Sequence, residues 1–315
     1  MSALLGRSSW ERDAAMAGAQ AQASRGTPLS ASRRTALALL ASACLFVAPR
    51  RAAASDAAPI RVGLNPLFLD SEIELLSMIS GYLTAQLNRP VQLVRRRTYQ
   101  EITALLLSGQ LDAAWVCDDP YVQHEDQLAL LATPVYNGMP LYQTYVIVNE
   151  NSPARTFDDL AGTIHAFSDP DSTSGYLVTR YLLALRHQTP ATFFHEFFFT
   201  YGHRNVVRAV ASELAGSGSI DGYVWDVMRK REPDLIDRTR VVYRSEPLGF
   251  PPVVCPKAVS QTETARAIAR AFLDMPHDKL GRKLLASLQL DGFVASTPDL
   301  YLGTLEKWLV VKAQT

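Results

Sequence analysis

Apolar residues in the first half of the chain alternate between short runs and helical spacing. An apolar run at 60–64 precedes apolar residues three or four positions apart over 73–87, which predicts a strand followed by a helix. A second run at 91–94, a helical stretch at 99–108 and a third run at 113–116 continue the alternation. Such alternation is typical of a parallel sheet covered by helices on both faces.

A second alternating series follows a strand predicted at 142–148. Its predicted strands lie at 163–167, 194–201, 220–225 and 241–243, and its predicted helices lie after Ser172 and at 205–214. A stretch rich in proline and glycine then interrupts the pattern at 245–252. The series ends with a strand predicted at 253–255 and helices predicted at 262–273 and 279–288.

These two series predict an α/β protein of two lobes, each a mostly parallel sheet flanked by helices. The second lobe is inserted into the first, so the chain crosses between the lobes twice, as a two-strand hinge. We expect the first lobe to comprise 55–143 and 251–315, and the second to comprise 144–250. Ligands of open α/β sheets bind beyond the carboxyl ends of the strands, which places the expected site in the cleft between the lobes.

The first 54 residues have the pattern of an export signal. Arg33-Arg34 precedes an apolar run at 36–48, and three alanines at 52–54 offer a cleavage site. The paired arginines suggest the twin-arginine route to the periplasm. Anchoring of a lipid at Cys44 is the alternative that we do not favour, because apolar residues continue beyond it.

Charge and cysteine content narrow the class of protein further. The first 54 residues hold seven arginines and two acidic residues, which leaves 24 basic and 29 acidic residues from Ser55 onward, a net charge of −5. A mildly acidic body argues against nucleic-acid binding. Cys117 and Cys255 are free to pair or to be buried apart. The chain has no spaced cluster of His and Cys, so we expect no metal and no cofactor.

Ser172-Thr173-Ser174-Gly175 is the strongest candidate for chemistry. It lies between an apolar run that ends at Phe167 and the start of a predicted helix. A helix start carries unpaired N–H groups and the positive end of the helix dipole, and hydroxyl side chains add further donors. This combination suits an oxyanion. The plainer interpretation is an N-cap, since Ser and Thr are ordinary capping residues.

Further polar residues follow predicted strands at equivalent places. Tyr121 follows the strand that ends at 116, His203 begins a helix, and Asp221 and Tyr223 lie in a predicted strand after a Gly-Ser-Gly stretch. Each has an ordinary alternative, as a packing, capping or turn residue. Together they point to one site because all lie at strand ends.

The order of these residues resembles the substrate-binding proteins of ABC transporters for phosphonate, phosphite and phosphate. The resemblance covers about residues 59–305. Its motifs are Ser172 to Leu177 after Asp169-Pro170-Asp171, Gly202-His203, Ile220 to Trp225, Tyr99, Leu111 to Trp115, Tyr121, Tyr142, Gly249 to Pro252, Gly292-Phe293 and Tyr301. It implies a two-lobed periplasmic binding protein of type II, expected to be a monomer, that delivers its ligand to a membrane permease.

The resemblance also implies a ligand-binding set. Its members are Ser172, Thr173, Ser174, Gly175, His203, Asp221, Tyr121, Tyr223 and Tyr142. The serine stretch would hold the oxyanion, His203 would donate to another oxygen, and Tyr121 would close from the first lobe. Asp221 would accept from a protonated oxygen or an ammonium group of the ligand.

Three alternatives remain at this point. Cys117-Asp118-Asp119 stands where many relatives have a small apolar turn, and a thiol in the cleft suggests a sulfur oxyanion. Ser172, His203 and Asp221 suggest a hydrolase, although no Gly-x-Ser-x-Gly elbow is present. A sensor of the same fold would use the same site. We expect a binding protein and not an enzyme.

Overall fold

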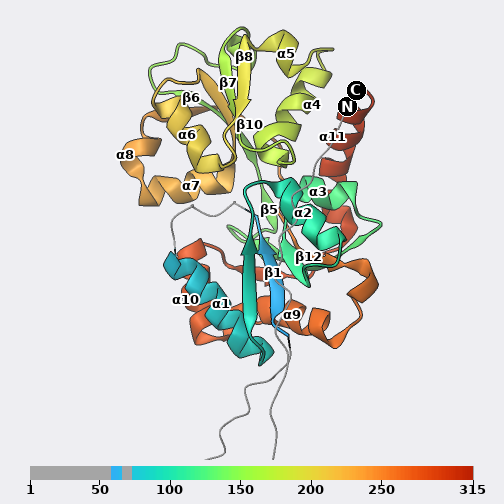
Figure 1. The fold of residues 1–315 in the computed structure, drawn as a ribbon. Helices are drawn as coiled ribbons and strands as arrows, with labels where there is room; N and C mark the ends of the chain where they lie inside the picture. Colours follow the sequence, from blue (N-terminus) through green and yellow to red (C-terminus); the bar gives the residue numbers. More distant parts are fainter. Residues whose placement is uncertain (1–57, 66–72, 315) are drawn as a thin grey trace, which may run out of the picture. The chain divides into compact units, whose positions relative to one another are not determined.

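The computed structural model of the chain describes residues 58–65 and 73–314, within one compact unit, Ala53–Thr315. The predicted export segment, with Cys44, lies outside the described residues. Two large sheets and one small sheet organise the described part of the chain (Figure 1). None of its helices combines the length and the apolar character needed to cross a membrane.

The first lobe is built on a six-stranded sheet of order β13-β4-β12-β3-β1-β2. Its strands are β1 (Ile60–Leu64), β2 (Val91–Arg95), β3 (Ala113–Trp115), β4 (Leu128–Val135), β12 (Val253–Pro256) and β13 (Gly292–Val294). β1 pairs in parallel with β2 and β3, whereas β12 and β13 pair antiparallel with their neighbours. The sheet is mixed rather than mostly parallel, because β12 enters directly from the second lobe without a crossover helix.

The second lobe is built on a five-stranded sheet of order β10-β6-β9-β7-β8. Its strands are β6 (Thr144–Asn149), β7 (Ile164–Phe167), β8 (Glu196–Phe199), β9 (Ser217–Asp221) and β10 (Thr239–Arg244). β7 pairs in parallel with β8 and β9, and β6 pairs antiparallel with β9 and β10. This sheet is mixed too. Between the lobes, β5 (Leu141–Tyr142) and β11 (Leu248–Gly249) form an antiparallel pair.

Helices cover both faces of the first sheet. The α-helices of the described chain are α1 (Ile73–Leu87), α2 (Tyr99–Leu107), α3 (Asp118–Gln123), α4 (Val178–Ala184), α5 (Pro190–Phe193), α6 (His203–Ala211), α7 (Gly222–Arg231), α8 (Pro233–Ile236), α9 (Glu263–Leu273), α10 (Lys279–Leu288) and α11 (Leu302–Lys312). Ala113 and Trp115 pack into the cluster with α1, α9 and α10, whereas Ala114 packs into the cluster with α2. The α/β class predicted from the sequence is confirmed.

One predicted strand is wrong. The stretch 220–225 is predicted as a strand, but β9 ends at Asp221 and α7 begins at Gly222. The Asp221 carboxylate accepts hydrogen bonds from the N–H groups of Tyr223 and Val224, so it caps the helix that replaces the predicted strand. The sequence pattern also did not predict β4 or α11.

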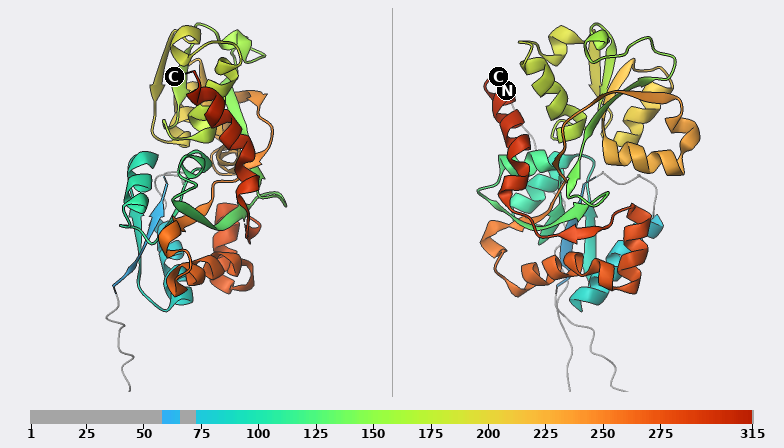
Figure 2. Two further views of the ribbon diagram at one scale, coloured as in Figure 1. Left: turned by 90° about the vertical axis from the view of Figure 1, so that its right-hand side faces the viewer. Right: turned by 180° about the vertical axis from the view of Figure 1, so that it is seen from behind.

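The C-terminal helix α11 contacts both lobes. It packs against α3 of the first lobe and α4 of the second, and Figure 2 shows it, in dark red, running from one lobe to the other. Gln314 Nε2 donates to Ala184 O at 2.7 Å, which fixes its end on the second lobe. Lys307, 3% exposed, forms an ion pair with Glu246 near the crossing. The lobe boundaries at 143/144 and 250/251 stay a prediction.

Candidate functional site between the lobes

The serine turn, residues 172–175, is buried at the start of a helical segment. Ser172 Oγ accepts a hydrogen bond from Gly175 N–H at 3.0 Å, which confirms the capping interpretation for Ser172. Thr173 and Ser174 take no part in this cap. A π-helical turn, Thr173–Leu177, leads into α4, and such turns are frequent at functional sites. The first N–H groups of the segment have no intrahelical acceptor, so they suit an anion.

Close packing requires glycine at position 175. A Cβ atom there would lie 1.6 Å from Ser168 Oγ. Ser168 follows β7, and its hydroxyl is buried without a hydrogen-bond partner. Gly175 therefore lets the turn approach the end of the strand.

His203 begins α6 and is buried as a neutral donor. Its Nδ1 accepts the backbone N–H of Asp221 at 3.2 Å. Because a backbone N–H only donates, the neutral ring carries its proton on Nε2, which lies 3.3 Å from the Tyr99 hydroxyl. Burial lowers the pKa of His203 to about 3, so the ring stays uncharged at neutral pH. His203 thus presents an N–H donor.

Only one of the two carboxylate oxygens of Asp221 has a hydrogen-bond partner. One oxygen, Oδ1, caps α7, whereas Oδ2 is buried with no hydrogen-bond partner. Burial raises the pKa of Asp221 to about 8, with a smaller contribution from the charge of Asp118. A buried carboxylate oxygen without a partner is costly. The site therefore needs a donor at this oxygen, either the carboxyl's own proton or a group of the ligand.

The first lobe contributes Asp118 at the start of α3. Its Oδ1 accepts from Tyr142 OH at 2.8 Å, and its Oδ2 accepts from Thr304 Oγ1 at 2.7 Å. Burial raises its pKa. Asp119 is buried beside it, hydrogen-bonded to Gln123, and burial raises its pKa to about 7. Both carboxyl groups are buried. Their hydrogen-bond partners and their raised pKa values reduce the repulsion between them and a bound anion.

Cys117 joins the two lobes. Its Sγ lies 3.4 Å from Thr173 N and 3.6 Å from Thr173 Oγ1. Burial raises its pKa well above the ordinary value, and the charge of Asp118 adds to the effect. The sulfur is therefore a thiol. Cys117 and Cys255 are both free and buried, so the pairing that the sequence left open is absent between them.

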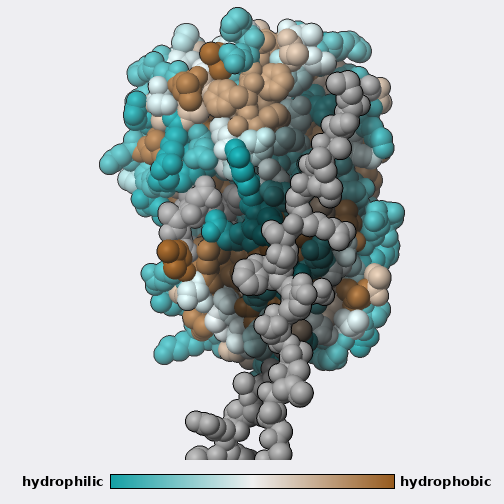
Figure 3. Space-filling view, in the orientation of Figure 1, coloured by the Kyte–Doolittle hydropathy of each residue, from teal (hydrophilic) through white to brown (hydrophobic). Residues whose placement is uncertain are grey.

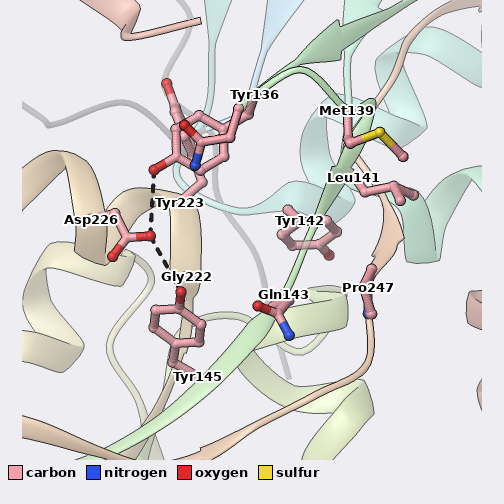
Figure 4. Close-up of a pocket in the computed structure, with 11 residues that line it drawn as sticks. Tyr136, Met139, Leu141, Tyr142, Gln143, Tyr145, Gly222, Tyr223, Asp226 and Pro247 are labelled. Atoms are coloured by element: carbon pink, nitrogen blue, oxygen red, sulfur yellow. Dashed lines mark hydrogen bonds between the residues drawn. The ribbon is translucent and has the colours of Figure 1, made fainter.

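Two predicted site tyrosines lie elsewhere. Tyr121 packs in the first-lobe core, its ring centroid 4.9 Å from that of Tyr301. Tyr223 donates from its hydroxyl to Leu288 O at 2.6 Å and lines a pocket of about 310 Å³ beside the hinge, which Tyr142 also lines (Figure 4). In that pocket Asp226 accepts from two further tyrosines, as the dashed lines show.

Tyr99, which the predicted set omitted, lies where Tyr121 was expected. It begins α2, its hydroxyl contacts His203, and its N–H donates to Asp169 at 3.2 Å across the lobes. A capping box formed by Thr98 and Glu101 fixes this helix start. That Thr-x-x-Glu spacing is a readable signal for the position of Tyr99.

Two more buried polar groups accompany the site. Asn65 follows β1, and neither of its side-chain amide atoms has a hydrogen-bond partner. Thr144 Oγ1, beside Asp221 in the sheet, is also unpartnered. On the face shown in Figure 3, the visible surface between the lobes is hydrophilic along its upper edge and includes hydrophobic residues along its lower edge. Among the described residues, no lysine or arginine takes part in the hydrogen bonds given in this subsection for the serine turn, His203, Asp221, Asp118 and Cys117. The site is built from neutral donors and carboxyl groups.

The chain matches a known protein family over most of its length. A sequence profile described as "ABC transporter, phosphonate, periplasmic substrate-binding protein" matches residues 62–301. The phosphonates-binding periplasmic protein of Escherichia coli K12 is 25% identical over 161 residues, 49% of this chain and 47% of that protein. The chain thus spans about half the length of this curated relative.

Solved structures show the same fold. A binding protein component of an ABC phosphonate transporter from Pseudomonas aeruginosa has a TM-score of 0.74 and 22% identity, covering 82% of this chain and 89% of that chain. A Prochlorococcus marinus protein in complex with methylphosphonate has a TM-score of 0.71 and 16% identity, covering 80% and 98%. The glutamate-bound GluR0 ligand-binding core from Nostoc punctiforme has a TM-score of 0.54 and 14% identity, covering 73% and 99%.

These likenesses confirm the type II binding-protein fold predicted from the sequence. The family is one of transporter binding proteins and not of enzymes. Since the family profile covers both lobes and the buried serine turn between them, the chain belongs to the periplasmic phosphonate-binding proteins of ABC transporters.

Proposed function

We propose that this protein captures a small phosphonate, or the related oxyanions phosphite and phosphate, between its lobes for uptake by an ABC transporter. The observation that carries the proposal is the buried serine turn facing neutral donors and an unpartnered carboxylate oxygen, Asp221 Oδ2. A relative of the same fold is solved with methylphosphonate. The permease is the expected partner, and a monomer is the expected state.

The site suits a tetrahedral anion that still carries a donor. The N–H groups of the serine turn and His203 Nε2–H would donate to ligand oxygens, which needs no buried counter-charge. Asp221 Oδ2 would accept from a protonated ligand oxygen or from an ammonium group. A ligand that carries a proton or an amine supplies the donor that Asp221 Oδ2 needs at any pH. A fully deprotonated anion meets no opposing negative charge only while the Asp221 carboxyl keeps its own proton, below about pH 8.

A hydrolase built from Ser172, His203 and Asp221 is disfavoured by the hydrogen bonds. In a catalytic triad, the acid accepts from His Nδ1–H and the serine hydroxyl meets Nε2. Here His203 Nδ1 accepts the Asp221 backbone N–H, and Nε2 meets Tyr99. Ser172 Oγ is engaged in the helix cap. We expect binding without turnover.

The proposal includes export through the segment 1–54, by the twin-arginine route and without lipid anchoring at Cys44. The family's location in the periplasm supports export, and the paired arginines at 33 and 34 support the route. Mass spectrometry of the mature protein from the periplasmic fraction would identify the cleavage point. A protein retained with the membrane and carrying lipid on Cys44 would contradict it.

Calorimetry with methylphosphonate, phosphite and phosphate tests the proposal. The double variant Ser174→Ala with His203→Ala should abolish binding while circular dichroism shows an intact fold. His277→Ala, which changes an exposed histidine of the first lobe, is the control and should bind as the wild type does. A ligand at about 1,000 times its Kd should raise the free energy of unfolding by about 4 kcal/mol. Unchanged affinity in the double variant would refute the site.

A further inference from the structure

The sulfur of Cys117 accepts a hydrogen bond from one N–H group of the serine turn. Cys117 follows β3 of the first lobe, and its sulfur lies 3.4 Å from the nitrogen of Thr173. Thr173 is the first residue of the helical segment, so its N–H has no intrahelical acceptor. An oxyanion bound at this helix start would use the same N–H group. The sulfur therefore occupies a position that the proposed ligand needs.

The contact is weak and uncharged. Cys117 is 2% exposed, and burial keeps it a neutral thiol. Neutral sulfur is a poor acceptor compared with an oxyanion oxygen. The thiol group itself lies 3.4 Å from Asp118 Oδ1, an acceptor for its proton. A ligand oxygen would thus replace a weak interaction of Thr173 with a stronger one.

Two buried side-chain oxygens of the same lobe as the serine turn have no hydrogen-bond partner. Asp221 Oδ2 is buried without a partner, although Asp221 is 1% exposed. The Tyr142 hydroxyl donates to Asp118 Oδ1 at 2.8 Å, and burial, with a smaller contribution from Asp118, raises the pKa of Tyr142. Ser168 Oγ, also buried, has no partner either. The N–H of Thr173 thus has the thiol as its partner, whereas Asp221 Oδ2 and Ser168 Oγ have none.

We infer that Cys117 is an internal competitor for the oxyanion, and that residue 117 thereby sets the affinity of the site. This inference rests on the proposed function. Binding exchanges the N–H···S contact for an N–H···O contact, and the sulfur must withdraw from Thr173 before the anion can reach the helix start. Removal of the sulfur should therefore tighten binding. Because every oxyanion displaces the same sulfur, the gain should be alike for all of them.

Two variants and one control test the inference by calorimetry with methylphosphonate, phosphite and phosphate. Cys117→Ala removes the acceptor, and we expect Kd to fall by about threefold to tenfold for each anion that binds, the worth of one weak hydrogen bond. Cys117→Ser keeps a polar group, but its shorter C–O bond withdraws the acceptor from Thr173, so a gain is expected there too. Cys255→Ala changes the other buried thiol, in β12, and should leave Kd unchanged.

The outcomes separate the inference from the proposed function. If the wild type binds and both position-117 variants, folded by circular dichroism, bind equally or more weakly, the inference is wrong and the proposed function stands. If the position-117 variants bind only one of the anions more weakly, the sulfur contacts that ligand directly. This result would also overturn the inference that Cys117 competes with the oxyanion. If the wild type and all variants bind none of the three anions, the proposed function fails and the inference fails with it.

Discussion

Asp221→Asn should change how the stability of the ligand-free protein depends on pH. In the folded protein the pKa of Asp221 is raised by burial from 3.8 to about 8. Between these values the folded state holds a proton that the unfolded state has lost, so the free energy of unfolding falls as pH rises. Below about pH 4 the residue has no such effect, and above about pH 8 the loss is complete.

The size of this loss follows from the two pKa values. Each tenfold change in proton affinity is worth about 1.4 kcal/mol, so the shift from 3.8 to about 8 corresponds to a loss of about 6 kcal/mol. Asparagine keeps an oxygen to accept the N–H groups of Tyr223 and Val224 and does not ionise. The variant should therefore be more stable than the wild type at pH 8.5, with a difference that shrinks by several kcal/mol at pH 5.

Urea unfolding at pH 5, 7 and 8.5 measures this difference. Other buried acids, such as Asp119, titrate in both proteins, so the comparison of variant with wild type isolates residue 221. Oxyanions must be dialysed away, since a ligand would mask the effect. A difference in stability that stays constant from pH 5 to 8.5 would refute the assignment of Oδ2 as a buried, unpartnered oxygen.

Three further variants test other parts of the structure. Gly175→Ala should lower the free energy of unfolding by about 1–3 kcal/mol, because its Cβ displaces Ser168; chemical denaturation would detect it, and wild-type stability would contradict the packing. Lys307→Met should cost about 1–3 kcal/mol, less than a fully buried pair because Glu246 is half-exposed, and a thermal melt equal to the wild type would contradict this. Burial lowers the pKa of His165 to about 3, so between about pH 6.5 and 4 this histidine is protonated only in the unfolded chain, and the wild type loses stability as pH falls. His165→Gln should reduce that loss. A variant whose urea midpoint depends on pH as the wild type's does would contradict this.

Local signals in the sequence predict several residues that the structure brings together. The serine turn was found because small hydroxyl residues follow a strand and precede a helix, and those relations lie within a few residues of each other. His203 and Asp221 were found at element boundaries for the same reason. In the structure they meet through the Asp221 backbone N–H, which periodicity does not reveal.

The errors arose where tertiary packing decides the direction of a side chain. Tyr121 and Tyr99 both begin or occupy helices near the first-lobe strand ends, but the rotation of the short helix α3 turns Tyr121 towards Tyr301. Tyr99 is directed to the site by its helix start and by its contact with His203 in the other lobe. The strand predicted at Ile220–Trp225 takes no account of Asp221 as a helix cap, and in the structure Asp221 ends β9 and caps α7.

The position of α11 has a consequence for measurements of lobe motion. The helix follows the first lobe in sequence, yet Gln314 is hydrogen-bonded to Ala184 of the second. Any opening of the cleft must either carry the helix along or peel its last turn away from α4. A fluorescent label at the C-terminus would report which of these two movements occurs without contacting the ligand site. A fusion partner attached there would hinder the movement and alter the measured lobe motion.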